Sequence, residues 1–134
     1  MSQQPFARKV ADQILAAETE TQIAEQKAAL KRNPNWAEGH YHLGQLYRVH
    51  RGCRDDAKRE LLTALELKPS LAEAHVALGE IYVTEGDFKR AREHAAYAAQ
   101  FGDVRLLERL KRYDREGSPE ASVPDEQLDN TGSR

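Results

Sequence analysis

One short pattern occurs twice in this chain and limits its fold more than any other feature. The first copy reads HYHLGQLY from residue 40, and the second reads HVALGEIY from residue 75, 35 residues later. A period in this range is the signature of stacked repeats, in which a single unit cannot bury its own apolar face. The pattern therefore predicts a chain built from similar units that pack on one another.

The residues around each copy follow the period of an α-helix. They recur at steps of four, three and four, as Trp36, His40, Leu43 and Tyr47 and again as Leu71, His75, Leu78 and Tyr82. A second helical stretch follows each of these helices after a turn. Pro69 ends the first unit and Gly102 ends the second. We therefore expect an all-α fold with helix pairs over residues 35–69 and 70–103.

Local signals predict where these helices begin. Asn35 and Ser70 are each followed three residues later by a glutamate, which is the pattern of a capping box. Between the helices of the second unit, Gly86 suits a left-handed turn and Asp87 suits the N-terminal cap of the next helix.

The flanks of the two units give weaker signals. Residues 3–34 predict a degenerate hairpin, broken near residues 18–20, and residues 104–116 predict one further, capping helix. The domain would thus span residues 1–116 with about seven helices. Residues 117–134 have little to bury and several acids, so they predict a disordered acidic tail.

The spacing of the repeated residues resembles that of the tetratricopeptide repeat (TPR) family. The matching residues are Leu43, Gly44, Tyr47, Ala57, Leu61, Ala64 and Pro69, and then Leu78, Gly79, Tyr82, Ala91, Ala95 and Ala98. The chain departs from the family where His40 and His75 stand in place of the usual Trp. The resemblance implies a right-handed stack of antiparallel helix pairs, in which the first helix of each pair lines a concave groove.

Composition excludes several classes of partner. The net charge is −2, with acids and bases interspersed, so we expect no nucleic-acid and no membrane partner. No apolar run approaches the length of a bilayer span. The single cysteine, Cys53, has no internal disulfide partner, and this favours a reducing compartment and a cytoplasmic location.

No catalytic motif is present. The sequence lacks a phosphate-binding glycine loop, a nucleophile elbow and a metalloprotease helix, so we predict no enzymatic activity and no catalytic residue. His50 and Cys53 have a spacing compatible with two metal ligands, but nothing nearby completes a set of three or four. We therefore expect no metal and no cofactor, and a metal or redox sensor is the least favoured function. His40 and His75 are predicted at the edge of the core, with a ring nitrogen bonded to backbone or water.

The remaining surface of the first helices is the candidate site. Its residues recur at helical spacing and differ between the copies: Tyr41, Gln45, Arg48, Val49, Val76, Glu80, Val83 and Thr84. Their mixture of aromatic, apolar and charged side chains suits a peptide or helix laid in a groove. The sequence therefore predicts a non-catalytic protein–protein interaction module, that is, an adaptor, scaffold, assembly factor or co-chaperone. Two alternatives are that some of these side chains only cover a neighbouring hairpin, and that the ends of the stack pair between chains to form a homo-oligomer.

Overall fold

The chain is all-helical throughout the part that the structure describes. The structure is a computed structural model that describes residues 5–50 and 53–116, so the tail predicted for residues 117–134 lies outside the described residues. It contains no strand in those ranges, and the all-α prediction is confirmed. The six helices are α1 (Pro5–Arg32), α2 (Ala37–Val49), α3 (Arg54–Leu67), α4 (Ala72–Thr84), α5 (Phe88–Gln100) and α6 (Arg105–Arg115).

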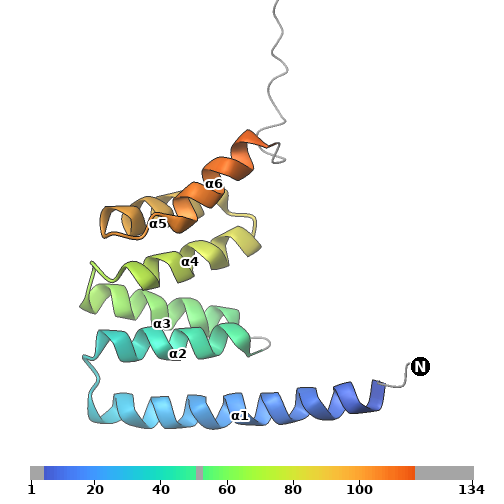
Figure 1. Cartoon of the computed structure of the whole chain (residues 1–134). Helices are drawn as coiled ribbons and strands as arrows, with labels where there is room; N and C mark the ends of the chain where they lie inside the picture. The colour runs from blue at the N-terminus through green and yellow to red at the C-terminus, as the bar shows by residue number, and fades with distance from the viewer. Residues whose placement is uncertain (1–4, 51–52, 117–134) are drawn as a thin grey trace, which may run out of the picture.

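The helices are layered in chain order. Each one packs against the next, from α1 on α2 to α5 on α6, and Figure 1 shows them one above another. Additional contacts join α2 to α4 and α4 to α6. These contacts place one side of α4 between α2 and α6, which is where the candidate site lies.

The N-terminal hairpin predicted for residues 3–34 is wrong, and with it the count of about seven helices among the described residues. α1 is a single helix of 28 residues, which corresponds to a length of about 42 Å. No glycine or proline interrupts it after Pro5, and the glutamates taken as a break are good helix formers. The hydroxyls of Thr19 and Thr21 donate to the carbonyls of Leu15 and Ala17, at 2.9 and 3.0 Å, within the helix.

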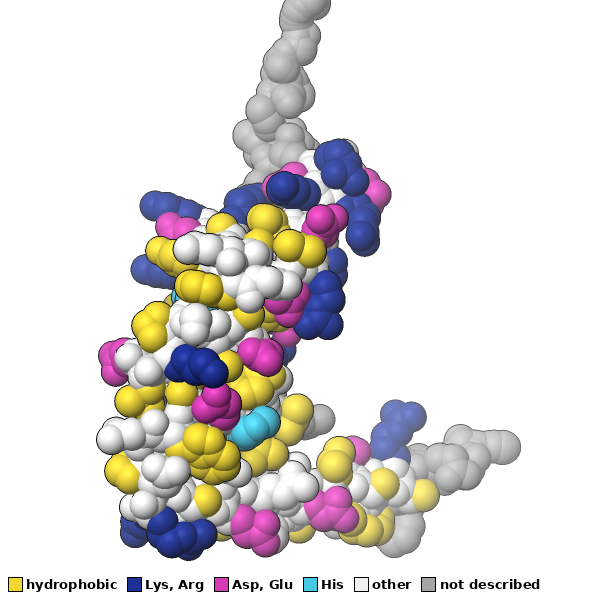
Figure 2. Space-filling model, turned by 60° about the vertical axis from the view of Figure 1, so that its left-hand side comes forward, with side chains coloured by type: hydrophobic (Ala, Val, Ile, Leu, Met, Phe, Trp, Pro, Cys, Tyr) yellow, Lys and Arg dark blue, Asp and Glu magenta, His cyan; other side chains and the backbone are white. Residues whose placement is uncertain are grey.

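The N-terminal part of α1 projects beyond the rest of the stack. Figure 2 shows it as an arm at the foot of the molecule. Near its other end, Leu30 is buried and Gln26 donates to the carbonyl of Gly39 in α2, at 3.2 Å. Even this longest helix is too polar to cross a membrane, and no other helix among the described residues has the necessary length and apolar character.

Two groups of buried side chains hold the stack together. The first spans α3 and α4 and consists of Ala57, Leu61, Ala64, Leu71, Ala74, Ala77, Leu78 and Ile81. The second joins α5 to α6 through Ala91, Ala95, Leu106 and Leu110. Gly44 lets α2 approach α3 closely, because a Cβ at this position would lie 2.8 Å from Cγ of Leu61. Small residues at the helix crossings thus set the distances between layers.

Both predicted capping boxes are wrong. α2 and α4 begin after Trp36 and Leu71, one residue later than expected, and neither has a side-chain cap. Backbone turns shift the start, since the amide of Trp36 donates to the carbonyl of Asn33 and that of Leu71 to Lys68. The turn between α4 and α5 is as predicted.

In that turn, Gly86 has a φ of +79°, in the left-handed region that glycine favours. The carboxylate of Asp87 accepts from the amide of Arg90 at the start of α5. The pKa of Asp87 is lowered, and this backbone hydrogen bond is the main cause.

The two repeated histidines tie each unit to the turn before it. Nε2 of His40 lies 2.9 Å from the carbonyl oxygen of Pro34, and Nε2 of His75 lies 2.9 Å from that of Pro69. His75 is 7% exposed. The prediction of core-edge histidines bonded to backbone is confirmed.

Candidate binding surface

A chain of hydrogen bonds crosses three helices on one side of the stack. The amide of Gln45 donates to the hydroxyl of Tyr41 at 3.3 Å, and Arg48 donates to the side-chain oxygen of Gln45 at 2.9 Å. Arg48 also reaches α4, where it donates to Oε1 of Glu80 at 2.9 Å. Arg109 of α6 donates to Oε2 of the same carboxylate at 2.7 Å. One continuous polar line therefore runs from α2 through α4 to α6.

Helical spacing explains the first half of this line. Tyr41, Gln45 and Arg48 follow one another at steps of four and three, so they share one face of α2. Glu80 lies on the facing side of α4, since α2 and α4 are in contact. The sequence predicted these four residues as part of the site, and the structure brings them together.

The ion pairs at Glu80 orient side chains more than they stabilise the fold. The side chains of Arg48 and Glu80 are 27% and 31% exposed, and that of Arg109 is 54% exposed. Partly exposed pairs of this kind contribute about 0–1 kcal/mol because water and salt screen them. However, each oxygen of the carboxylate has its own guanidinium, so the positions of both arginines are fixed by one acid.

Tyr41 occupies an intermediate environment at the end of the polar line. Its ring packs against the core group that spans α3 and α4, and its pKa is raised by burial and then by the nearby charge of Glu73. A raised pKa keeps the phenol neutral at physiological pH, so its hydroxyl remains able to donate a hydrogen bond. Part of this side chain thus serves packing, as the alternative reading of the sequence expected.

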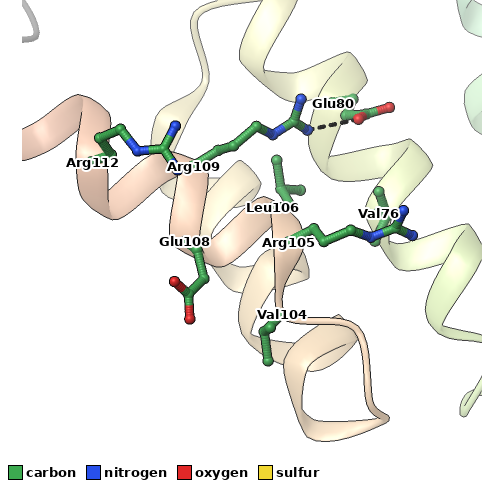
Figure 3. A pocket seen from close by; sticks show the side chains of 8 residues that line it. All are labelled: Val76, Glu80, Val104, Arg105, Leu106, Glu108, Arg109 and Arg112. Carbon is green, nitrogen blue, oxygen red and sulfur yellow. Dashed lines mark hydrogen bonds and ion pairs between the residues drawn. The ribbon is translucent and has the colours of Figure 1, made fainter.

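Two neighbouring hollows lie on either side of the Glu80–Arg109 pair. The first has a volume of about 710 Å³ and is lined by Arg48, Glu80, Val83, Thr84, Phe88, Leu106, Arg109, Leu110 and Tyr113. The second has a volume of about 700 Å³ and is lined by Val76, Glu80, Val104, Arg105, Leu106, Glu108, Arg109 and Arg112 (Figure 3). Both volumes fall in the range of about 300–1,000 Å³ that is usual for ligand pockets. Apolar walls with a few fixed charges suit the side chains of a bound peptide.

Most of the predicted residues belong to these two hollows, and Val49 lies elsewhere, beside α1. Val83 and Thr84 line the first hollow with Arg48 and Glu80, and Val76 lines the second. Val49 does not join them: it is 71% exposed and faces α1, where it lines hollows that include Leu15 and Gln22. Five of the eight predicted residues therefore line the two hollows. Tyr41 and Gln45 connect to them only through the hydrogen bonds that lead to Arg48, and Gln45 also lines a hollow with Val49.

The contribution of α6 was not predicted. The sequence indicated only a capping helix at residues 104–116, but α6 supplies one wall of both hollows through Leu106 and Arg109. Its alternation of leucines and arginines indicates an amphipathic helix. The orientation of α6 against α4 and α5 decides which residues its polar face contacts. The helix period in the sequence does not determine that orientation.

His50 and Cys53 lie close together at the turn between α2 and α3. Nδ1 of His50 is 3.3 Å from Sγ of Cys53, and Nε2 of the same ring is 3.5 Å from the carboxylate of Glu20 in α1. Over residues 5–50 and 53–116, no three His, Cys, Asp or Glu side chains are placed to share a metal ion. The pair links the end of α2 to the start of α3.

A second polar contact, between two histidines, is enclosed by α4 and α5. Nδ1 of His75 lies 3.1 Å from Nδ1 of His94. Because Nε2 of His75 faces a carbonyl, it carries a proton, and Nδ1 of a neutral His75 then accepts from His94. The pKa of His94 is lowered by burial and then by the proximity of His75. The His94 ring also stacks on Tyr82, with centroids 5.6 Å apart.

Comparison with known proteins adds no assignment. No protein-family model matches the chain, and no curated protein matches it.

Proposed function

We propose that this chain is a non-catalytic protein-interaction module of the tetratricopeptide type, which binds a peptide or helix of another protein. The observation that carries the proposal is the polar line from Arg48 through Glu80 to Arg109, set between two open hollows with apolar walls. The chain would act as an adaptor, scaffold or assembly factor. It would need no cofactor, nucleic acid or membrane, and it would work in the cytoplasm.

The composition of the surface supports a peptide ligand. Val83, Phe88 and Tyr113 offer apolar and aromatic contacts to side chains, while the two arginines and Glu80 offer hydrogen bonds of defined direction. A preformed surface of this kind loses little conformational entropy on binding, because its charged side chains already hold one another. Two repeats in register, stacked in chain order, support the right-handed arrangement that the TPR resemblance implies.

Affinity capture from a lysate of the source cells tests the proposal. The tagged wild-type chain is compared with the Arg109→Glu variant, which reverses the charge between the hollows and repels Glu80. The matched control is Arg59→Glu on α3, an equally drastic change at a side chain that is 61% exposed and pairs only locally with Asp56. We expect the wild type and the control to retain the same partner and Arg109→Glu to lose it.

Thermal melting monitored by circular dichroism must accompany this comparison. Arg109 is half exposed, so its substitution should change the melting temperature little. If all three chains capture the same proteins with the same yield, this surface is not the binding site. Loss of capture together with loss of helicity would point to unfolding, and Arg48→Gln, which keeps a hydrogen-bonding group, then provides the milder test.

Self-association is the second candidate function, and the exposed arm of α1 favours it. Ile14 and Leu15 are 55% and 63% exposed, and Val49 of α2, which lines a hollow with Leu15, is 71% exposed. Light scattering over a hundredfold concentration range would measure the molar mass of the wild type and of Leu15→Glu. A mass that stays at 15.2 kDa throughout would exclude self-association.

A further inference from the structure

The face of α6 that lines the second hollow carries a surplus of positive charge. α6 contains five arginine or lysine residues and two acids. Arg105, Arg109 and Arg112 follow one another at steps of four and three, so they form a row along one side of the helix. Figure 2 shows dark blue side chains gathered at this end of the molecule, and Figure 3 shows the three arginines around the hollow.

Nearby acids neutralise this row only in part. Arg105 pairs with Asp103 but its side chain is 81% exposed. Among residues 5–50 and 53–116, Arg109 pairs with Glu80 alone, and it shares this acid with Arg48. Arg112 has no ion pair with any of the described residues. Glu108 also lines the hollow, but Figure 3 shows its side chain pointing away from that of Arg109.

Between the arginines, the hollow offers an apolar floor. Leu106 lies at its centre, and Val76 of α4 faces it across the hollow (Figure 3). Val104 adds a further apolar side chain that is 48% exposed. The chemistry fits a short segment with several carboxylates and one or two aliphatic side chains, and it disfavours a basic segment.

The chain itself contains such a segment directly after α6. Residues 118–129 read SPEASVPDEQLD, with four acids, two aliphatic residues and no arginine or lysine. We propose that this segment binds the arginine row of its own α6 and the floor of the adjacent hollow, and so occupies the surface that an acidic partner would use. Its carboxylates would pair with Arg105, Arg109 and Arg112. Val123 or Leu128 would contact Val76 and Val104, since Leu106 itself is only 2% exposed.

The length of the segment allows this contact. The row from Arg105 to Arg112 spans about 10 Å at 1.5 Å per helical residue. Ten extended residues reach about 33 Å, which is enough to turn back and run along the row. In this arrangement the chain would have to reverse just after α6, where the sequence has Gly117, and glycine adopts turn conformations without steric cost.

Because the segment is part of the same chain, even a weak contact is enough to keep it bound to α6 for much of the time. Exposed ion pairs are individually worth little, but a short connection gives the segment an effective concentration in the millimolar range. The contact should therefore weaken as salt is added. The inference rests on the proposed function for the location of the surface, but it requires no external partner. The contact of the segment and the binding of a partner can therefore be tested separately, and either can fail while the other holds.

Nuclear magnetic resonance of the full-length chain tests the contact. The ¹⁵N-labelled wild type is compared with a variant in which the segment is neutralised by Glu120→Gln, Asp125→Asn, Glu126→Gln and Asp129→Asn. We expect amide shifts to differ between the two chains at Val76 and along residues 105–112. The differences should shrink in 0.5 M salt and should not change over a tenfold range of protein concentration.

A peptide of residues 118–130 provides the second measurement. It should bind the neutralised chain on the order of tenfold more tightly than the wild type, whose own segment competes. Arg109→Glu, made in the neutralised chain, should abolish this binding, whereas Arg59→Glu in the same chain should not. Identical α6 shifts in the two full-length chains would overturn the proposal, as would shift differences that grow with concentration, because the contact would then lie between molecules. If this contact is found but Arg109→Glu still captures a partner from lysate, only the proposed function fails.

Discussion

Glu60 and His94 occupy equivalent positions in the two repeats and contact equivalent histidines. Oε1 of Glu60 lies 2.8 Å from Nδ1 of His40, and Nδ1 of His94 lies 3.1 Å from Nδ1 of His75. In both repeats the other nitrogen of the contacted ring faces a proline carbonyl. The first repeat thus offers acceptors to both nitrogens of its histidine, whereas the second pairs two rings that can share a single proton. In the second repeat, the pKa of His94 is shifted from its ordinary value.

The stability of the second repeat should fall as the solution becomes acidic. The pKa of His94 is lowered from 6.5 because burial disfavours its charged form, and the charge of His75 adds to this effect. The unfolded chain therefore binds a proton more readily than the folded chain. The stabilisation is present above about pH 6.5 and is lost as the pH falls through that value toward the folded pKa.

Melting temperatures at pH 7.5 and 5.5 check this expectation. His94→Gln can still donate to His75 but does not titrate, so the loss of melting temperature between these pH values should be smaller in the variant than in the wild type. The histidines outside the His75–His94 contact are the same in both chains, so the comparison reports on this contact alone. Equal losses would show that His94 contributes nothing to the pH dependence.

Replacing His94 by glutamate should convert the second repeat to the arrangement of the first. The carboxylate would accept from Nδ1 of His75, as that of Glu60 does from His40, and the ring could then hold both protons. A charge-assisted hydrogen bond contributes about 1.5–3 kcal/mol, from which the lost stacking on Tyr82 must be subtracted.

We expect His94→Glu to melt at least roughly 4 °C above the wild type at pH 5.5, which corresponds to a net gain of about 1 kcal/mol. At pH 7.5 the gain should be smaller or reversed. His94→Gln serves as the control, since glutamine has the same shape as glutamate but places no charge beside His75. A variant that melts below the wild type at both pH values would contradict the equivalence of the two positions.

Helix spacing predicted the repeats, the glycines at their crossings and half of the polar line, because each of these depends on neighbours three or four residues away. The predicted break near residue 18 was wrong because the charged residues there were interpreted as a turn. Neither glycine nor proline is present to end the helix at that point, so it continues. Arg109 could not be found from the sequence. Its partner is Glu80, 29 residues earlier, and their meeting depends on how α6 is seated against α4.

Gly44 and Gly79, which occupy the same position in the two repeats, should respond differently to substitution by alanine. At Gly44, the new Cβ would lie 2.8 Å from Cγ of Leu61, a branch point in a fully buried side chain, and 3.3 Å from the carbonyl oxygen of Ala57. At Gly79, the closest atom is a terminal methyl of Leu106, which can rotate away. Overpacking of a rigid site costs about 1–3 kcal/mol.

Alanine also gains about 1 kcal/mol of helix propensity over glycine, and this partly offsets the clash at both positions. Urea denaturation should therefore show Gly44→Ala destabilised by up to roughly 2 kcal/mol, and by more than Gly79→Ala, which should change by less than about 1 kcal/mol. A larger destabilisation by Gly79→Ala than by Gly44→Ala would mean that α6 is held more rigidly than α3.

Two leucines on α1 provide a test of where this long helix is anchored. Leu30 is 7% exposed and its methyl group lies against Gly39 of α2, whereas Leu15 is 63% exposed on the projecting arm. Truncation of a buried leucine costs about 2–5 kcal/mol, and truncation of an exposed one costs within about 0.5 kcal/mol. Leu30→Ala should therefore lower the free energy of unfolding by at least about 2 kcal/mol, and Leu15→Ala should leave it almost unchanged. If Leu15→Ala proves comparably destabilising and its effect grows with protein concentration, the arm is packed against a second copy of the chain, and self-association would then explain its exposed apolar residues.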